Sequence, residues 1–241
     1  MKSLRLFLCI ILLCGMTGCG VIDYMFLPPP EDTVQEIYEL AKDSMQEKKY
    51  KTAIKYYTKI KDNYPFSPYA LEAELAVGDA YFLLEQYSEA SEAYQEFESL
   101  HPRHESIPYV LYQIGLSEFK TFYSIDRPTT MVGKALEYFK RVQESYPESE
   151  YAIKAAQQIT ECRKIMAEHE MFVGDMYWQM KKYGSARDRY LYIINNYQDI
   201  TELKDHAQKK AEAAYYMEKE QQGESDRRKV HGNWRDYFKW L

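Results

Sequence analysis

Apolar and small residues recur along this chain at helical spacing, in blocks that repeat about every 34 residues. The clearest block is residues 71–104, whose pattern is carried by Val77, Gly78, Tyr81, Tyr87, Ala90, Tyr94, Phe97 and Pro102. Small residues such as Gly78 and Ala90 let two antiparallel helices approach closely, and aromatic side chains fill the space around them. Pro102 ends the second helix because it has no N–H to donate. Each block therefore predicts two packed helices.

The spacing of this block is that of a tetratricopeptide (TPR) repeat. A first unit covers residues 34–67, a third covers residues 108–148 with an eight-residue insertion, and a fourth covers residues 149–199. The fourth begins with a long helix that either runs unbroken or breaks near Ala167. Residues 201–241 add a helix over 201–221 and a weaker one after residue 225. Because one pair cannot bury its own apolar face, the units must stack. The sequence predicts an all-α, TPR-type α-solenoid of about five helix pairs over residues 33–241.

The beginning of the chain predicts export and a lipid anchor. Residues 1–18 have basic residues, an apolar run too short to span a membrane, and then small residues, as in a secretory signal peptide. Met16-Thr17-Gly18-Cys19 resembles the lipobox of bacterial lipoproteins, with Met16 in place of the usual leucine. We therefore expect lipidation of Cys19, the alternative being an ordinary cleaved signal with an incidental cysteine. Gly20, in place of aspartate, favours transfer to the outer membrane. The proline-containing residues 19–32 predict an extended tether, and Thr33 a capping box with Glu36.

Charge and motif content exclude several classes of function. The chain carries 31 basic and 37 acidic residues, which argues against a nucleic-acid-binding protein. It has no glycine-rich phosphate loop, nucleophile elbow or CxxC, so we expect no enzyme, no cofactor and no metal. His169-Glu170 begins like a zinc-protease helix, but Val173 stands where the second histidine is required. His101 and His104 flank Pro102 in a turn, where solvated histidines are more common than a metal site.

Aromatic and arginine side chains are the candidate binding residues. Of the 24 tyrosines, those at repeat positions are explained mostly by helix packing, although tyrosines on a concave face also suit peptide binding. They are Tyr50, Tyr57, Tyr81, Tyr87, Tyr94, Tyr183 and Tyr190. Tyr69 lies off the repeat positions and is a better candidate ligand. Arg187 and Arg189 lie on the second helix of the fourth unit. They form either a solvated face paired with nearby acids or an anchor for a partner's carboxylate or aromatic ring.

Several motifs lie outside the general TPR pattern. They are Tyr64-Pro65-Phe66-Ser67-Pro68-Tyr69, His101-Pro102-Arg103-His104, Ile107-Pro108-Tyr109-Val110-Leu111-Tyr112, Gly115-Leu116, Asp126-Arg127, Tyr146-Pro147-Glu148-Ser149-Glu150-Tyr151-Ala152 and Ala167-Glu168-His169-Glu170. With these motifs the chain resembles, over residues 33–199, the BamD family of TPR lipoproteins of the outer-membrane β-barrel assembly machinery. It departs from that family at Gln198 and in the ending Phe238-Lys239-Trp240-Leu241.

The resemblance implies a non-enzymatic scaffold that is lipid-anchored in the outer membrane and faces the periplasm. Its implied partners are the periplasmic POTRA region of BamA, other lipoproteins of the assembly complex, and the targeting segments of unfolded outer-membrane proteins. Carried over by position, client binding falls on Tyr64, Phe66 and Tyr69. BamA docking falls on Tyr183, Arg187 and Arg189. The alternative is another periplasmic TPR lipoprotein adaptor, such as one coordinating cell-wall synthesis with envelope constriction. An envelope hydrolase is a third class, but the sequence shows no nucleophile with a base and no metal cluster.

Overall fold

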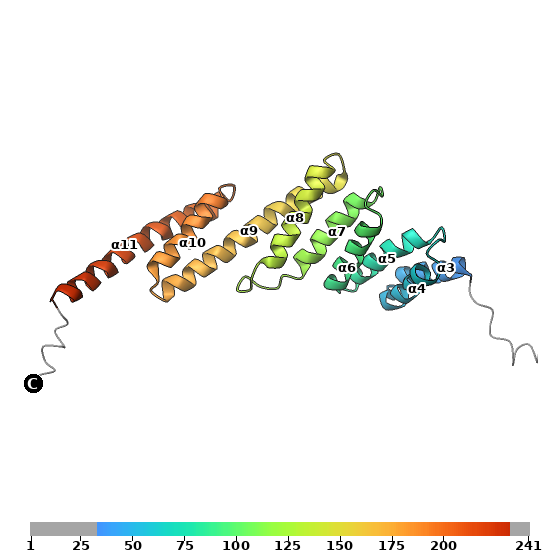
Figure 1. Ribbon diagram of the computed structural model, residues 1–241, viewed down its shortest axis with the longest axis horizontal. Coiled ribbons are helices and arrows are strands. Elements are labelled where there is room, and N and C mark those ends of the chain that lie inside the picture. Colours follow the sequence, from blue (N-terminus) through green and yellow to red (C-terminus); the bar gives the residue numbers. More distant parts are fainter. Residues whose placement is uncertain (1–32, 232–241) are drawn as a thin grey trace, which may run out of the picture. The chain divides into compact units, whose positions relative to one another are not determined.

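The computed structural model describes residues 33–231, in which every regular element is an α-helix (Figure 1). The prediction of an all-α fold is confirmed. None of the described helices combines the length and hydropathy needed to cross a bilayer. The signal peptide, Cys19 and the tether fall in residues 1–32, outside the described part. In chain order the helices are α3 (Val34–Gln46), α4 (Tyr50–Asn63), α5 (Ala70–Leu83), α6 (Tyr87–Leu100), α7 (Ile107–Lys120), α8 (Thr130–Ser145), α9 (Glu150–Gln179), α10 (Tyr183–Asn196) and α11 (Thr201–His231).

The chain divides into two compact units, one ending at Ala73 and one beginning at Glu74. In the first unit α3 and α4 form an antiparallel pair. The predicted capping box is confirmed: the Thr33 hydroxyl accepts from the Glu36 N–H at 3.3 Å, and the Glu36 carboxylate accepts from the Thr33 N–H at 2.7 Å. The cap starts α3 in the register that turns its apolar stripe toward α4. Side chains buried in this unit include Ile37, Ala41, Ala53, Tyr57 and Ile60.

Three of the turns between paired helices share one backbone conformation. Lys48, Glu85 and Lys181 have φ of 59°, 62° and 59°, in the left-handed region. After each of them, the next N–H donates to a carbonyl five residues back, as Gln86 does to Tyr81 at 3.0 Å. This is a Schellman-type helix end, which glycine usually provides. The α7–α8 connection differs, because residues 121–129 form a longer loop between the two helices. The sequence places the insertion around residues 123–132, but α8 already begins at Thr130.

Helix pairs of the second unit are held together at glycines that face an aromatic ring. A Cβ atom added to Gly78 would lie 2.7 Å from the Tyr94 ring, and one added to Gly174 would lie 2.5 Å from the Tyr190 ring. Gly115 meets the Phe139 ring in the same way, at 2.8 Å. A small residue is therefore required at these positions, but the group that lies nearest Gly78 is the Tyr94 ring of the second helix and not Ala90.

The residue after two of these glycines is an aspartate that fixes the ring. The Asp79 carboxylate accepts hydrogen bonds from the Tyr94 hydroxyl at 2.6 Å and the Tyr109 hydroxyl at 2.5 Å. Burial raises the pKa of Asp79, and the two hydroxyl donors oppose part of that rise. In the later pair, Asp175 accepts from the Tyr190 hydroxyl at 2.6 Å. Its second donor is an ammonium group from the following helix, Lys210 Nζ at 2.6 Å.

One continuous helix, α9, packs against the helix before it and the helix after it. Over its 30 residues, α9 contacts α8 along its first half and α10 along its second half (Figure 1). It has no break near Ala167, which is completely buried, so the unbroken alternative is correct. Cys162 is also buried on α9, and burial raises the pKa of its thiol to about 12. It is a small core residue with an inert thiol.

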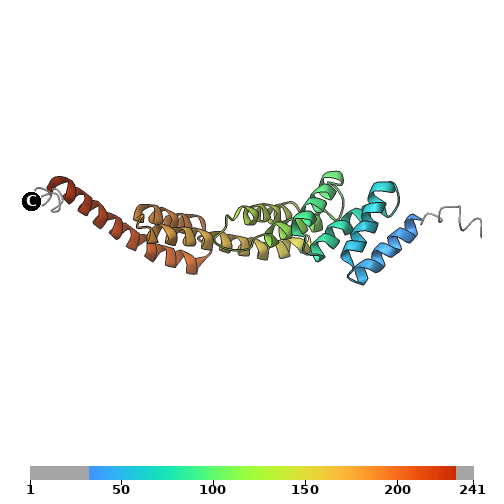
Figure 2. The ribbon, with the colours of Figure 1, turned by 90° about the horizontal axis from the view of Figure 1, so that it is seen from below.

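The last described helix is longer than the sequence predicted. The expected end near residue 221 is wrong, because α11 continues without interruption from Thr201 to His231 and extends past the beginning of α10, to which it runs antiparallel (Figures 1 and 2). Residues with high helix propensity and local ion pairs carry the helix through this region, and the lone Gly223 does not stop it. Only the first half of α11 joins the core, where its contribution is Ala207, Ala211 and Ala214. Residues 232–241 lie outside the described part.

Candidate functional site

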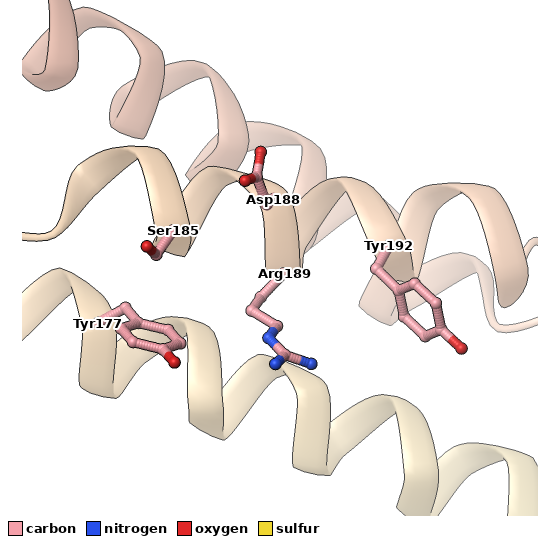
Figure 3. A pocket seen from close by; sticks show the side chains of 5 residues that line it. All are labelled: Tyr177, Ser185, Asp188, Arg189 and Tyr192. Carbon is pink, nitrogen blue, oxygen red and sulfur yellow. The ribbon is translucent and has the colours of Figure 1, made fainter.

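A pocket of about 350 Å³ opens between α9 and α10 in the second unit (Figure 3). Tyr177 lines it from α9, and Ser185, Asp188, Arg189 and Tyr192 line it from α10. The four α10 residues are spaced i, i+3, i+4 and i+7, so they share one face of the helix. Tyr192 is 46% exposed. The pocket therefore presents a cation, a carboxylate, a serine hydroxyl and two tyrosine rings to a ligand.

Arg189 is held in this pocket and remains accessible. Its guanidinium points from α10 toward α9, where Nη1 donates to the Glu170 carboxylate at 3.0 Å (Figure 3). This hydrogen bond is the main cause of the raised pKa of Arg189. The side chain is still 44% exposed, and an ion pair this exposed contributes at most about 1 kcal/mol to stability. The geometry thus orients Arg189 while leaving donors for a second carboxylate.

The structure does not bring the three predicted docking residues onto one surface. Arg187 faces α11, where Nη1 lies 2.5 Å from the Glu218 carboxylate and the guanidinium lies 5.9 Å from the centre of the Tyr215 ring. Two positions along an α-helix correspond to a rotation of about 200°, so Arg187 and Arg189 point to opposite neighbours. Tyr183 begins α10 and packs edge-on against Trp178, with ring centroids 5.2 Å apart. Of the three, Arg189 lines the pocket.

A second pocket, of about 410 Å³, lies in the first unit and is lined by the predicted client-binding residue Tyr69. The Tyr69 ring stacks on Tyr38, with centroids 4.7 Å apart and planes at 24°. Burial and a hydrogen bond with Glu72 raise the pKa of Tyr38. Lys42 lies on the same wall, 5.9 Å from the Tyr38 ring centre. The remaining lining residues are Gln35, Glu39, Asp43 and Gln46.

The other two predicted client-binding residues, Tyr64 and Phe66, come shortly before Tyr69 in the sequence but do not line the pocket. Phe66 is completely exposed, which is unusual for a large apolar side chain. Tyr64 is half-buried directly after α4, and its N–H donates to the Ile60 carbonyl at 2.9 Å. The structure therefore separates an aromatic pocket wall from an exposed aromatic side chain a few residues before it.

The histidines weighed as metal ligands have other neighbours. His101 Nε2 lies 2.6 Å from the Glu74 carboxylate, and His169 Nδ1 lies 2.6 Å from the Ile125 carbonyl. His169 thereby ties the inserted loop to α9. Among residues 33–231 no three His, Cys, Asp or Glu side chains gather in a way that could hold a metal ion.

Comparison with known proteins identifies the family. Over residues 30–229 the sequence matches the YfiO family, described as outer membrane lipoproteins. The chain belongs to this family. Among the curated relatives of this YfiO-family chain, the outer membrane protein assembly factor BamD of Neisseria gonorrhoeae is 27% identical over 177 residues, which cover 69% of this chain and 66% of the relative. These relatives carry the name of the family predicted from the motifs, so that resemblance is confirmed.

Other relatives are similar to comparable extents. BamD of Caulobacter vibrioides is 25% identical, covering 76% of this chain and 61% of that protein. BamD of Rickettsia prowazekii is 29% identical, covering 64% and 61%. The YfiO-family chain thus spans just under two thirds of the length of these relatives. Among solved structures, the TPR2AB-domain:pHSP90 complex of yeast Sti1 superposes with a TM-score of 0.48 at 13% identity, covering 76% of this chain and 70% of that one.

Sequence reasoning missed most of the residues that line the two pockets. On α10 the i, i+3, i+4, i+7 spacing from Ser185 to Tyr192 was a usable signal, because it marks a face that includes Arg189. Tyr177 and Glu170 come from α9 and have no local signal that points to α10. In the first unit, Tyr38 was not singled out, and only its stacking on Tyr69 connects the two.

Proposed function

We propose that this YfiO-family chain is a non-enzymatic scaffold of outer-membrane protein assembly. In this proposal acyl chains on Cys19 anchor it to the outer membrane, and the helical body faces the periplasm. Membership of a family of outer membrane lipoproteins supports the location, and the relatives named as assembly factors support the process. The observation that carries the proposal is the preformed, exposed Arg189 pocket between α9 and α10.

In this proposal the Arg189 pocket docks the periplasmic POTRA region of BamA. Arg189 is oriented by Glu170 and keeps free donors, so a partner carboxylate can bind it without reorganisation of the helix pair. Tyr177 and Tyr192 flank the guanidinium and provide large contact area at low entropic cost. Because the pocket is formed before binding, little affinity is lost to ordering. Binding of other assembly lipoproteins uses surfaces outside this pocket.

The pocket of the first unit receives the targeting segments of unfolded outer-membrane proteins. Stacked Tyr38 and Tyr69 offer a flat aromatic wall, and Lys42 adds one positive charge beside it. Glu39 and Asp43 on the same lining outnumber Lys42, so these groups fit an extended segment that carries an aromatic side chain and no net negative charge. Phe66, exposed just before the pocket in the chain, extends the aromatic surface available to such a segment. The proposed mechanism is display of two bound partners, with no covalent step.

Co-purification tests the docking part of the proposal. The lipidated, tagged chain is purified from its own envelope as wild type, Arg189→Ala and Arg187→Ala, and each sample is tested for BamA. Alanine is preferable to glutamate at position 189 because a carboxylate there would repel Glu170. Arg187→Ala is the matched control, since it removes the same side chain two residues away on the face toward α11. Circular dichroism verifies that each variant is folded.

The expected result is recovery of BamA by wild type and Arg187→Ala, and its loss with Arg189→Ala. Loss with Arg187→Ala alone would move the docking surface to the α10–α11 face. If wild type recovers no BamA, the assembly role fails, and an adaptor that coordinates cell-wall synthesis with envelope constriction takes its place.

A further inference from the structure

Helix α4 carries a row of exposed lysines. Lys51, Lys55 and Lys59 are spaced four residues apart, so they lie along one side of the helix and span about 12 Å of its length. In the described part of the chain none of these three lysines forms an ion pair, whereas other lysines do. The opposite side of α4 is buried in the core of the first unit and consists of Ala53, Tyr57 and Ile60.

The charge of α4 differs from that of its neighbours in the sequence. The helix contains four lysines and one acidic residue, Asp62, so it has three more basic than acidic residues. Among the helices that the structure describes, none has a larger excess of basic residues, and α3, α5 and α6 each contain more acidic than basic residues. The lysine row, Lys51, Lys55 and Lys59, is therefore a local basic surface on a chain of net charge −6.

We propose that the lysine row binds the anionic headgroup surface of a lipid bilayer, as a membrane contact separate from the acyl chains. Lysine is a point charge on a flexible stem, which suits a diffuse layer of phosphates. The remaining exposed positions of α4 are Thr52, Asp62 and Asn63. The face thus lacks the aromatic or apolar anchor around which specific protein interfaces are built. A fluid anionic surface needs no such anchor.

The place of α4 in the chain favours a bilayer as the occupant of this surface. This step rests on the lipidation of Cys19 in the proposed function. Thr33 follows Cys19 by 14 residues, and a chain extends by at most about 3.6 Å per residue, so Thr33 lies within about 50 Å of the anchored residue. Helix α3 begins there, and α4 packs against α3. The anchor therefore raises the effective concentration of the lysine row at the membrane surface.

The lysine row and the aromatic pocket of the first unit use different surfaces of the α3–α4 pair. Ile37 of α3 is completely buried, and the pocket residues Gln35 and Glu39 lie two positions before and after it. Two positions along a helix correspond to about 200°, so these two residues lie on the outer side of α3. The lysine row lies on the outer side of α4. A bilayer bound to the row thus leaves the pocket open to its own ligand.

The strength of the contact follows from its charge. Each basic residue near an anionic surface contributes roughly fivefold to affinity, so loss of the three lysines should weaken binding by about a hundredfold. The attraction acts within a Debye length, which is about 8 Å at physiological ionic strength. Binding through the lysine row should therefore also weaken steeply as salt is added.

Vesicle binding of the non-acylated chain tests the proposal independently of the anchor. Residues 19–241 with Cys19→Ala are mixed with vesicles of phosphatidylcholine alone, or of phosphatidylcholine with phosphatidylglycerol, and binding is measured by flotation. The lysine-row variant is Lys51→Gln/Lys55→Gln/Lys59→Gln. The matched control removes three exposed lysines from α7 and α8 and is Lys120→Gln/Lys134→Gln/Lys140→Gln. Glutamine and lysine have similar helix propensities, so both variants should fold, which circular dichroism verifies.

The expected result is binding to the phosphatidylglycerol vesicles only, about a hundredfold weaker in the lysine-row variant and unchanged in the control. Acetylation followed by mass spectrometry gives a second readout at single residues. On phosphatidylglycerol vesicles Lys51, Lys55 and Lys59 should be protected from acetylation, whereas Lys134 and Lys140 should not. Inorganic phosphate, added at constant ionic strength, should not compete with the vesicles.

Three outcomes would overturn the proposal. Competition by inorganic phosphate would show a free-phosphate site in place of a bilayer contact. Equal weakening in both variants would show that the lysine row has no special part in binding. If the parent chain bound no phosphatidylglycerol vesicles, an acidic protein partner would become the occupant of the row. Recovery of BamA is measured separately with the lipidated chain, so failure of this inference is distinguishable from failure of the proposed function.

Discussion

Substitution of Gly174 by alanine tests the packing rule that joins the helix pairs. The added methyl would lie 2.5 Å from Cε1 of Tyr190, and that ring cannot move freely because it is completely buried and its hydroxyl donates to Asp175. Overpacking of this kind costs about 1–3 kcal/mol. Replacing a helical glycine by alanine recovers about 0.5–1 kcal/mol of backbone entropy. We expect a net loss of roughly 1 kcal/mol, and at most about 2.5 kcal/mol, in the free energy of unfolding.

The matched control is Gly133→Ala in α8, where an added Cβ meets no atom within 4 Å. This variant only recovers backbone entropy and adds no steric clash, so it should be more stable than wild type by about 0.5–1 kcal/mol. Urea denaturation followed by circular dichroism measures both. A third variant, Gly174→Ala combined with Tyr190→Phe, removes the hydroxyl anchor, so the glycine substitution should cost less in that background. If Gly174→Ala and Gly133→Ala changed the free energy of unfolding in the same direction, the packing argument would be refuted.

Two further predictions concern a half-buried acid and a strained turn. Because burial raises the pKa of Asp79 above 3.8, its contribution to stability is complete below that pH and is lost as pH rises through the folded-state pKa. Asp79→Asn should therefore gain stability relative to wild type as pH rises above 3.8, measured by urea midpoints; a difference in midpoint between the two proteins that does not change with pH would contradict this. At Glu85, with φ of 62°, glycine should be more stable than alanine by about 1 kcal/mol in thermal unfolding. The reverse order would show that this turn is not strained.

The local sequence pattern was sufficient to predict the fold, because all the residues that specify one helix pair lie within about 34 consecutive positions. Gly78, Tyr81, Tyr94 and Phe97 were recognisable from spacing alone. The unbroken course of α9 was left open, because no residue near Ala167 distinguishes a long helix from two shorter ones. The end of α11 was misjudged at residue 221, since its last turns depend on weak local pairs that a hydrophobic pattern does not record.

The candidate site was only partly predictable for a different reason. Arg187 and Arg189 look alike in the sequence, and an acidic chain makes both stand out. Their separation depends on Glu218 and Glu170, which come from α11 and α9. No local pattern encodes which acid meets which arginine, because the pairing follows from how the helices stack. The same holds for Tyr38 and Tyr69, whose stacking joins α3 to the turn after α4.

The continuity of α9 has a mechanical consequence. A solenoid usually bends or unzips at the turns between its repeats, yet α7 to α11 are joined through a helix that has no turn in its middle. A force that pulls α7 and α11 apart acts on the backbone hydrogen bonds of α9. The same force acts on the packed interfaces of α9 with α8 and with α10. We expect this half of the protein to yield as one block under force, so that strain applied at α11 is felt at α8 before any repeat detaches.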